Sequence, residues 1–311
     1  MKPLLQTDFP TVVDSTIRST YVNCPRKAYW EYMRHLRIRK TSIHLHFGKC
    51  FAAGLESYRL AFFRDKIPTE EAELIGVRRV LSEWGTYEES EGDGYKTLDR
   101  CIFGLQAYVR QYPPHTDHIQ PHFSGYMPMV EFSFALPMEI MHPDTGDPIL
   151  YCGRFDLLGQ YNGQLWVVDE KTASRLGPSW NRSWIMRGQF LGYCKAALEH
   201  NIPVAGAIVR GMSILKDSYG FAEVILPTQK WKIEEWWEQL HVDIGNMVAD
   251  YHSNRFGKVY GDACSAYSGC PYVHLCDTPH PERWTSQYNT VRWDPLTHTE
   301  IVIKPPVKEE G

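Results

Sequence analysis

The chain has 311 residues, enough to bury the core of one large domain or two small ones. Hydrophobic residues make up 43% of it and charged residues 23%, the fractions of an ordinary globular protein. The formal net charge of −4 excludes the strong overall positive field of many nucleic-acid-binding proteins, so any contact with nucleic acid must rest on local charge.

The N-terminal stretch MKPLLQTDF has no long apolar region, which argues against a signal peptide. No other stretch approaches the ~20 apolar residues that cross a membrane. We therefore expect a cytoplasmic protein. In such a reducing compartment the eight cysteines indicate metal binding rather than disulfides.

The first third of the sequence predicts helices. Asp14 or Ser15 could cap a short helix, and Pro25 suits the first turn of the next one. Three further segments have helical patterns: 47–64, 69–91 and 95–112. A Gly-Asp-Gly run near position 93 predicts a break, and residues 113–122 predict a loop.

A local basic cluster lies between Cys24 and Lys40, with Glu31 as its one acidic residue. Its basic residues are Arg26, Lys27, Arg34, Arg37, Arg39 and Lys40. Such a cluster could follow a phosphate backbone, or it could be the solvated face of a helix.

From Pro128 onward the pattern changes to strands. The expected strands are 130–138, 149–160, 163–172, 204–215 and 220–227. Residues 184–198 and 228–254 predict helices, the second of them long and amphipathic. The tail after Asp277 is rich in proline and predicts irregular structure.

The dipeptide Asn162-Gly163 predicts a two-residue hairpin turn between two of these strands. If it forms the turn, Tyr161 faces Gln164, and counting outward places Asp156 directly opposite Asp169. Directly opposed side chains have Cβ atoms ~5 Å apart, so two carboxylates there repel one another.

Lys171 falls on the same face of its strand as Asp169, because side chains alternate with a period of two. A hard divalent cation would relieve the repulsion between the two carboxylates, and the lysine could then orient a water or stabilise charge on a phosphoryl group. The alternative is a solvated sheet face with Lys171 as a neutralising surface residue. On the helix that follows, Gln189 and Tyr193 lie four apart and therefore on one face.

Three cysteines follow the long helix at intervals of six residues: Cys264, Cys270 and Cys276. Three thiolates need a fourth ligand to hold tetrahedral zinc or an iron–sulfur cluster. His274 and Cys24 are both candidates, and spacing alone does not separate a Cys₃His zinc site from a four-cysteine cluster. The other cysteines predict buried apolar positions: Cys50, Cys101, Cys152 and Cys194.

Three motifs in order resemble the PD-(D/E)XK nuclease superfamily: Gly153-x-x-Asp156, Asp169-x-Lys171 and Gln189-x-x-x-Tyr193. The resemblance is closest to the RecB-like iron–sulfur exonucleases, which include CRISPR-associated spacer-acquisition exonucleases and phage relatives. It implies an α/β fold, with a mixed central sheet flanked by helices, a helical N-terminal part and a restriction-endonuclease-like core. The implied function is hydrolysis of DNA phosphodiester bonds by an exonuclease that acts on single strands or ends.

The resemblance also assigns roles to residues. It implies that Asp156 and Asp169 bind Mg²⁺ or Mn²⁺, with the carbonyl of Glu170 as a further ligand, and that Lys171 is catalytic. Gln189 and Tyr193 would contact DNA near the site. Partners would be DNA and proteins of recombination or CRISPR adaptation.

The cysteine pattern resembles the iron–sulfur branch of this family, which has one cysteine before the nuclease core and three after it. The stretches 21–30 (YVNCPRKAYW) and 270–276 (CPYVHLC) carry this likeness. It implies a 4Fe–4S cluster held by Cys24, Cys264, Cys270 and Cys276. Five residues separate Cys264 from Cys270 where many relatives have two, which we interpret as a variant loop.

One position departs from the family. Ala52 stands where the family's FGxxxHAGLE helix has a metal-binding histidine. Glu56, one turn further on, His46 or Glu131 could replace that ligand. The alternative is a catalytically weakened DNA-end-binding or adaptor module that keeps the nuclease fold; a third possibility is a zinc-stapled protein unrelated to nucleases.

The expected organisation has four parts: a helical region at 1–120, the nuclease core at 121–256, the cluster segment at 257–280 and an irregular tail at 281–311.

Overall fold

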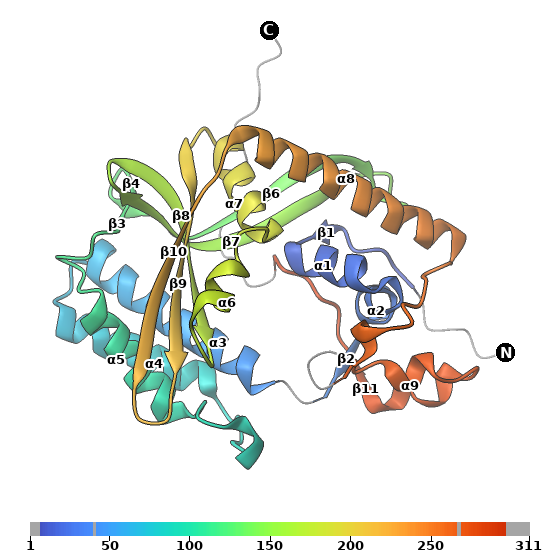
Figure 1. Cartoon of the computed structure of the whole chain (residues 1–311), viewed down its shortest axis with the longest axis horizontal. Coiled ribbons are helices and arrows are strands. Elements are labelled where there is room, and N and C mark those ends of the chain that lie inside the picture. Colours follow the sequence, from blue (N-terminus) through green and yellow to red (C-terminus); the bar gives the residue numbers. More distant parts are fainter. Residues whose placement is uncertain (1–6, 40–41, 266–268, 297–311) are drawn as a thin grey trace, which may run out of the picture. The chain divides into compact units, whose positions relative to one another are not determined.

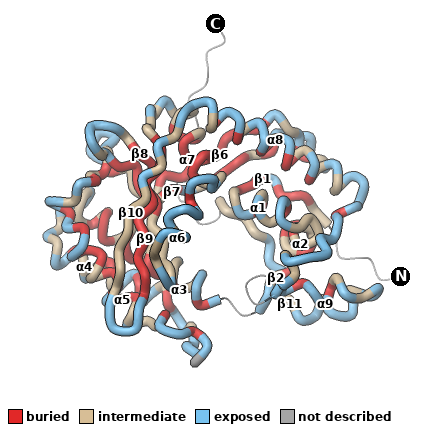
Figure 2. Tube along the Cα trace, viewed as in Figure 1, coloured by how far each residue is buried: buried red, intermediate tan, exposed pale blue. Residues whose placement is uncertain are grey.

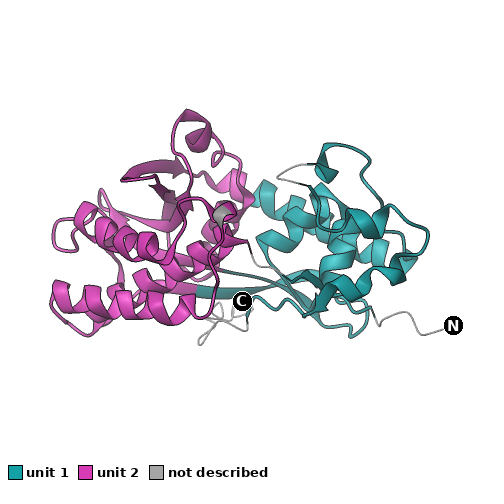
Figure 3. Cartoon of the chain, turned by 90° about the horizontal axis from the view of Figure 1, so that it is seen from below, with its two compact units in different colours: residues 1–40, 133–153, 234–311 teal, residues 41–132, 154–233 magenta. Residues whose placement is uncertain are grey.

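A computed structural model describes residues 7–39, 42–265 and 269–296. Lys40 of the basic cluster and residues 297–311 lie outside the described residues. The chain divides into two compact units, each assembled from separate segments (Figure 3). Unit 1 comprises 1–40, 133–153 and 234–311, and unit 2 comprises 41–132 and 154–233.

The main sheet is mixed, as the family resemblance implied (Figure 1). Its strands follow the order β1-β7-β8-β9-β10, and β3 and β6 also pair with β7. The β7–β8 and β9–β10 pairs are antiparallel, whereas β8 and β9 are parallel. The strands are β1 (Val12–Val13), β3 (Gln120–Pro121), β6 (Val130–Met141), β7 (Pro148–Tyr161), β8 (Gln164–Ala173), β9 (Val204–Ile214) and β10 (Tyr219–Pro227).

Two small sheets accompany it. In unit 1, β2 (Leu36–Ile38) pairs with β11 (Tyr288–Thr290). In unit 2, β4 (Phe123–Ser124) pairs with β5 (Met127–Pro128).

The helices of unit 2 are α3 (Ile43–Arg59), continued by the π-helical turn η2 (Leu60–Arg64), then α4 (Thr69–Trp84), the 3₁₀ turn η3 (Glu91–Asp93), α5 (Leu98–Gln111), α6 (Pro178–Arg182) and α7 (Gly188–Glu199). Unit 1 contains α1 (Ser15–Asn23), α2 (Pro25–Ala28), the π-helical turn η1 (Tyr29–Met33), α9 (Val273–Cys276) and the 3₁₀ turns η4 (Asp262–Cys264), η6 (Pro281–Arg283) and η7 (Thr285–Gln287). The long helix α8 (Lys230–Ser253) begins at the end of unit 2 and runs into unit 1.

Unit 2 is a layered α/β structure. Helices α3, α4 and α5 share one apolar core, to which β9 contributes Met212 and Ile214. On the other face of the sheet, α6 and α7 form the crossover that two adjacent parallel strands require, and α7 packs on β8 and β9. Figure 2 shows β9 buried along its length between these layers.

Several local predictions are confirmed. Asp14 caps α1, its Oδ1 accepting the Ile17 amide at 2.7 Å, and Pro25 is the first residue of α2. Asn162 and Gly163 have φ values of 48° and 73°, the left-handed conformation that a type I′ turn needs. The resulting register pairs Tyr161 with Gln164, as expected.

Other boundaries differ from the sequence prediction. The helix expected at 69–91 ends at Trp84, because Gly85 adopts a φ of 56° and ends the helical path. Helix α3 begins earlier than expected, at Ile43, where the Ser42 hydroxyl accepts the His44 amide. The C-terminal tail is not wholly irregular, because β11 joins β2 in a sheet. No helix among the described segments has both the length and the apolar composition needed to cross a lipid bilayer.

Candidate active site

The hairpin opens at its acidic residues. The last backbone pair of the β7–β8 ladder is Leu157 with Val168, so Asp156 and Asp169 are the next residues in register. One step further along β8, the Glu170 amide donates to Asp156 Oδ2 at 2.6 Å. A carboxylate thus replaces the backbone carbonyl as hydrogen-bond acceptor, and its charge is held at the point where the two strands separate.

Lys171 contacts the buried carboxylate of Asp169 on the same face of β8, as the alternation predicted. Burial, together with the charge of Asp169, raises the pKa of Asp156 well above its usual range. Burial also raises the pKa of Asp169, although Lys171 opposes this shift. One ammonium therefore lies beside two carboxylates, buried Asp169 and half-buried Asp156, and does not balance their combined negative charge.

Glu131, at the start of β6, adds a third acid. Its φ of 54° is unusual for a residue with a side chain, and such strain is typical of functional sites. Arg154 Nε lies 2.7 Å from Glu131 Oε2. Burial nevertheless raises the pKa of Glu131 to about 8, and the charge of Glu56 on α3 contributes to the rise. The charge of Glu131 in turn raises the pKa of Asp156.

The side chain of Glu170 points to the opposite face of β8 and is fully engaged there. Its carboxylate accepts from both terminal nitrogens of Arg59 on α3 and, at 2.9 Å, from the Tyr108 hydroxyl on α5. Burial alone would raise the pKa of Glu170, but Arg59 lowers it to about 2. The Glu170 carboxylate is therefore an anchor of β8, and only its carbonyl is left for the predicted role as a ligand.

Sequence reasoning missed this anchoring network. It continues to Arg210 on β9, whose guanidinium binds Asp117 with two hydrogen bonds of 2.7 and 2.6 Å and also binds Glu223 at 2.7 Å. Arg210 is 1% exposed. A lone arginine inside the apolar run 204–214 was the available signal, because a buried charge needs a partner.

The predicted helical pair is also formed. Gln189 Nε2 donates to the Tyr193 hydroxyl at 2.7 Å, across one turn of α7. The buried Tyr193 ring contacts Phe155, the chain neighbour of Asp156, with ring centroids 5.7 Å apart. Tyr193 therefore packs on the β7 residue that precedes Asp156 in the chain, and Gln189 is held beside Tyr193 by their hydrogen bond.

His46 lies in different surroundings. Its ring stacks on Tyr87 with centroids 4.3 Å apart, and its Nε2 lies 3.6 Å from the Cys50 thiol. No contact described for His46 involves Asp156 or Asp169. Glu56, one turn after Ala52 on α3, acts through its charge on Glu131.

In unit 1, the four predicted cysteines line one cavity of about 160 Å³: Cys24, Cys264, Cys270 and Cys276. Arg26, Lys27 and Lys258 line it as well, together with Asp277, so its charged lining is positive on balance. All eight cysteines are free thiols. His274 does not line the cavity; its ring stacks on Trp284, with centroids 5.6 Å apart.

Among the described residues, neither the carboxylates of unit 2 nor the thiols of unit 1 form a complete metal-binding site. Within residues 7–39, 42–265 and 269–296, no three His, Cys, Asp or Glu side chains are placed to hold a metal ion together. The carboxylates of unit 2 act on one another through charge, and the thiols of unit 1 share a cavity.

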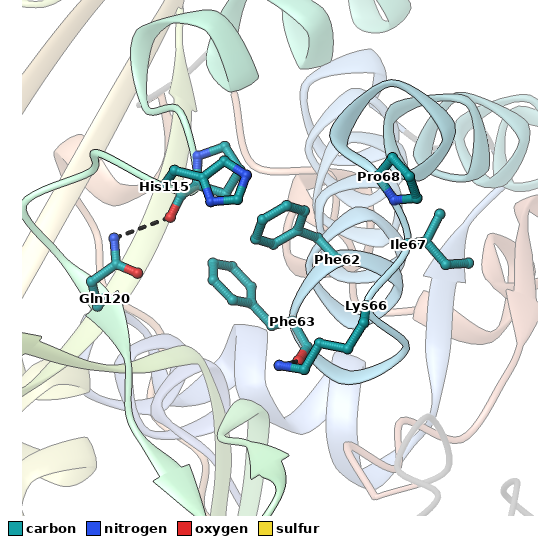
Figure 4. Close-up of a pocket in the computed structure, with 8 residues that line it drawn as sticks. Phe62, Phe63, Lys66, Ile67, Pro68, His115 and Gln120 are labelled. Carbon is teal, nitrogen blue, oxygen red and sulfur yellow. Dashed lines mark hydrogen bonds between the residues drawn. The ribbon is translucent and has the colours of Figure 1, made fainter.

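A second cavity, of about 480 Å³, lies in unit 2, and none of the acidic residues described above lines it (Figure 4). Phe62 and Phe63 from η2 face His115 and Gln120 across it. Gln120 Nε2 donates to the Pro114 carbonyl at 3.2 Å, which fixes the loop that forms this wall. The other lining residues are Lys66, Ile67, Pro68 and Pro114.

A carboxylate pair and a lysine at the open end of a hairpin, in a mixed sheet covered by helices, define a nuclease of the restriction-endonuclease-like class. The family model for the PD-(D/E)XK nuclease superfamily matches residues 16–277. The chain therefore belongs to the PD-(D/E)XK nuclease superfamily.

Two solved structures are distantly similar to the chain. One is the crystal structure of SSO0001, at 13% identity and a TM-score of 0.32, covering 75% of this chain and 76% of that one. Another is described as a "Putative exonuclease" from Eubacterium rectale, at 10% identity and a TM-score of 0.35, covering 68% of this chain and 85% of that one. Scores this low carry no argument about function. No curated protein matches the chain.

Proposed function

We propose that this protein hydrolyses DNA phosphodiester bonds with Mg²⁺ or Mn²⁺, as an exonuclease that acts on single strands or DNA ends. The observation that carries the proposal is the pair of adjacent carboxylates, half-buried Asp156 and buried Asp169, with the single ammonium of Lys171 beside it. Two adjacent carboxylates with one cation beside them are unfavourable unless a proton or a metal ion neutralises the excess negative charge.

The donor set suits a hard divalent cation, which prefers carboxylate oxygens. Asp156 and Asp169 would hold the ion, with the Glu170 carbonyl as a further ligand and Glu131 and Glu56 nearby. When bound, the ion supplies Lewis-acid stabilisation of the phosphoryl oxygens.

The protein's own groups would do the rest. Lys171, which contacts Asp169, would orient the attacking water or stabilise the charge that develops on the phosphoryl group. Gln189 and Tyr193 would position the DNA strand from α7. The Glu170–Arg59 ion pair fixes β8, which keeps Asp169 and Lys171 in place.

Glu56 is our candidate to replace the ligand lost at Ala52. It lies one turn beyond Ala52 on α3, and its charge already acts on Glu131. A second function, a DNA-end-binding module with weakened catalysis, is favoured by Ala52 itself.

We also propose a structural 4Fe–4S cluster on Cys24, Cys264, Cys270 and Cys276. The shared cavity, whose charged lining is three cations and the acid Asp277, supports a four-thiolate site, because a cluster with bound thiolates carries negative charge. The stacking of His274 on Trp284 disfavours the Cys₃His zinc alternative. Such a cluster would join Cys24 to a segment 240 residues later in the chain, restricting the unfolded state.

The deciding experiment is a cleavage assay on end-labelled single- and double-stranded DNA with Mg²⁺, Mn²⁺ or EDTA. Stepwise shortening that requires metal supports the exonuclease. DNA binding without cleavage under every metal condition would support the binding module instead.

A further inference from the structure

The segment between Lys171 and Gln189 carries a positively charged surface that the acidic site does not explain. Residues 171–198 contain no aspartate or glutamate. Three arginines of this segment are exposed: Arg175, Arg182 and Arg187. Across the described part of the chain, no carboxylate forms an ion pair with any of the three. Their charge is therefore available to an external anion.

The basic cluster near the N-terminus differs in this respect. Arg37 contacts the Glu31 carboxylate, and its guanidinium lies 4.9 Å from the Tyr32 ring centre. Arg34 is buried and donates to the Tyr29 hydroxyl. Much of that cluster is thus engaged within unit 1, which weakens its case as the main contact for DNA.

The arginine segment lies beside the proposed catalytic lysine. Gly211 on β9 is the register partner of Lys171, so their side-chain positions share one face of the sheet, ~4.8 Å apart. The Trp180 ring of α6 fills the space over Gly211: a Cβ there would lie 2.5 Å from two of its atoms. Helix α6 therefore covers the sheet immediately next to Lys171 and carries Arg182 at its end.

An exposed apolar tip lies between two of the arginines. Ile185 and Met186 are 53% and 78% exposed, although they follow the buried Trp184. The Arg187 guanidinium lies 5.4 Å from the Trp184 ring centre. Lys232 Nζ donates to the Ile185 carbonyl at 3.0 Å and brings another positive charge to the tip.

We propose that this surface, the arginine patch (Arg175, Arg182 and Arg187 with the tip Ile185–Met186), binds a single DNA strand and leads it to Lys171. Guanidinium groups bind phosphates, and an apolar side chain among them can pack on an unstacked base or enter between two bases. The patch deepens the proposed nuclease function, on which it rests, by naming the surface that holds the substrate.

Binding of a fluorescent single-stranded oligonucleotide, measured by anisotropy over a range of KCl concentrations in EDTA, tests the patch without hydrolysis. The double variant Arg182→Gln/Arg187→Gln should bind roughly tenfold more weakly at low salt. The negative slope of log K against log salt should become shallower by about 1.4, or ~0.7 per lost phosphate contact. Met186→Ser should weaken binding without changing that slope, because no charge is lost.

The chain offers a matched control in Arg78→Gln/Arg110→Gln, which removes two exposed arginines from α4 and α5 of the same unit. Equal affinity and slope in the two double variants would overturn the patch, as would a wild-type protein that binds no DNA in EDTA. Loss confined to the Arg182/Arg187 variant supports it. Cleavage by wild type with Mn²⁺ is measured separately. If wild type binds DNA through the patch but never cleaves it, the nuclease proposal fails. If wild type cleaves DNA while both double variants bind it equally, only the patch proposal fails.

Discussion

The Glu170 amide, two residues beyond the last backbone pair on β8, donates at 2.6 Å to Oδ2 of Asp156, which is one residue beyond that pair on β7. This bond gives Asp156 a structural task in addition to the metal binding that we propose. The two tasks need different properties of the side chain, an acceptor oxygen for the amide and a negative charge for the metal. They can therefore be separated by substitution.

Asp156→Asn should keep the fold and lose activity, because its amide oxygen can still accept the Glu170 N–H while the charge is gone. Without metal, we expect this variant to be at least as stable as wild type, since it also removes the repulsion from Asp169. Thermal unfolding with and without Mn²⁺ checks this: wild type should be stabilised by Mn²⁺ and the variant should not. Asp156→Ala, the matched control, leaves the amide unpaired and should cost about 1–3 kcal/mol. A Mn²⁺-stabilised Asp156→Asn variant would contradict the assignment.

Lys171→Met should separate binding from catalysis. Burial would lower the pKa of Lys171, but Asp169 and Asp156 raise it, so the side chain is charged at neutral pH and its proposed role is in the transition state. We expect the variant to retain stabilisation by Mn²⁺ and to lose cleavage by about 100-fold or more. Lys195→Met, which removes an ammonium paired with Glu199 on α7, is the control and should cleave like wild type. Cleavage retained by Lys171→Met would remove the lysine from the mechanism.

The stability of the metal-free protein should fall as the pH rises toward 9. Glu131 has a folded pKa of about 8, raised by burial above the usual 4.5, so folding favours its protonated form. Its contribution to stability is complete below pH 4.5 and is lost as the pH rises through about 8. Denaturant unfolding in EDTA at pH 6 and pH 9 measures this effect. Between these pH values the free energy of unfolding of wild type should fall by about 2 kcal/mol more than that of Glu131→Gln. Equal pH profiles would show that Glu131 is ionised in the folded protein.

Features encoded by neighbouring residues could be predicted from the sequence, and features made by distant residues could not. Asn162-Gly163 encodes the hairpin locally, because both positions need a positive φ, and the register that carries Asp156 and Asp169 follows from the turn alone. The partnership of Arg59 with Glu170 spans 111 residues. It forms only when α3 packs on the sheet, so no local pattern reveals it.

The same distinction applies to short elements. Val12–Val13 pairs in parallel with Leu150 and Tyr151, and two residues are too few to display a strand period. Glu131 looks in the sequence like any acid at the start of a strand. Its burial and its positive φ come from the surrounding fold.

The cluster proposal predicts a coloured protein. Purified without oxygen, wild type should contain about four irons per chain and absorb broadly in the visible range, as thiolate-bound iron–sulfur centres do. Cys24→Ser should lose both the colour and the iron, because Cys24 lines the cavity with the three late cysteines. Cys194→Ala changes a buried cysteine outside that cavity and should retain both. Stoichiometric zinc without iron in protein handled anaerobically would exclude the cluster.

The last prediction concerns Ala52. If Glu56 replaces the family's histidine as a metal ligand, Glu56→Gln should abolish Mn²⁺-dependent cleavage. Adding Ala52→His to the Glu56→Gln variant should restore cleavage, because the two positions lie one turn apart on α3. His46→Ala is the control and should leave cleavage intact, since its ring packs on Tyr87. If instead Ala52→His alone raises the activity of wild type and Glu56→Gln has no effect, the natural site lacks this ligand. A weakened nuclease that binds DNA ends would then be the better description. Cleavage rates of all four variants on one end-labelled single strand, at matched Mn²⁺ concentration, decide between these outcomes.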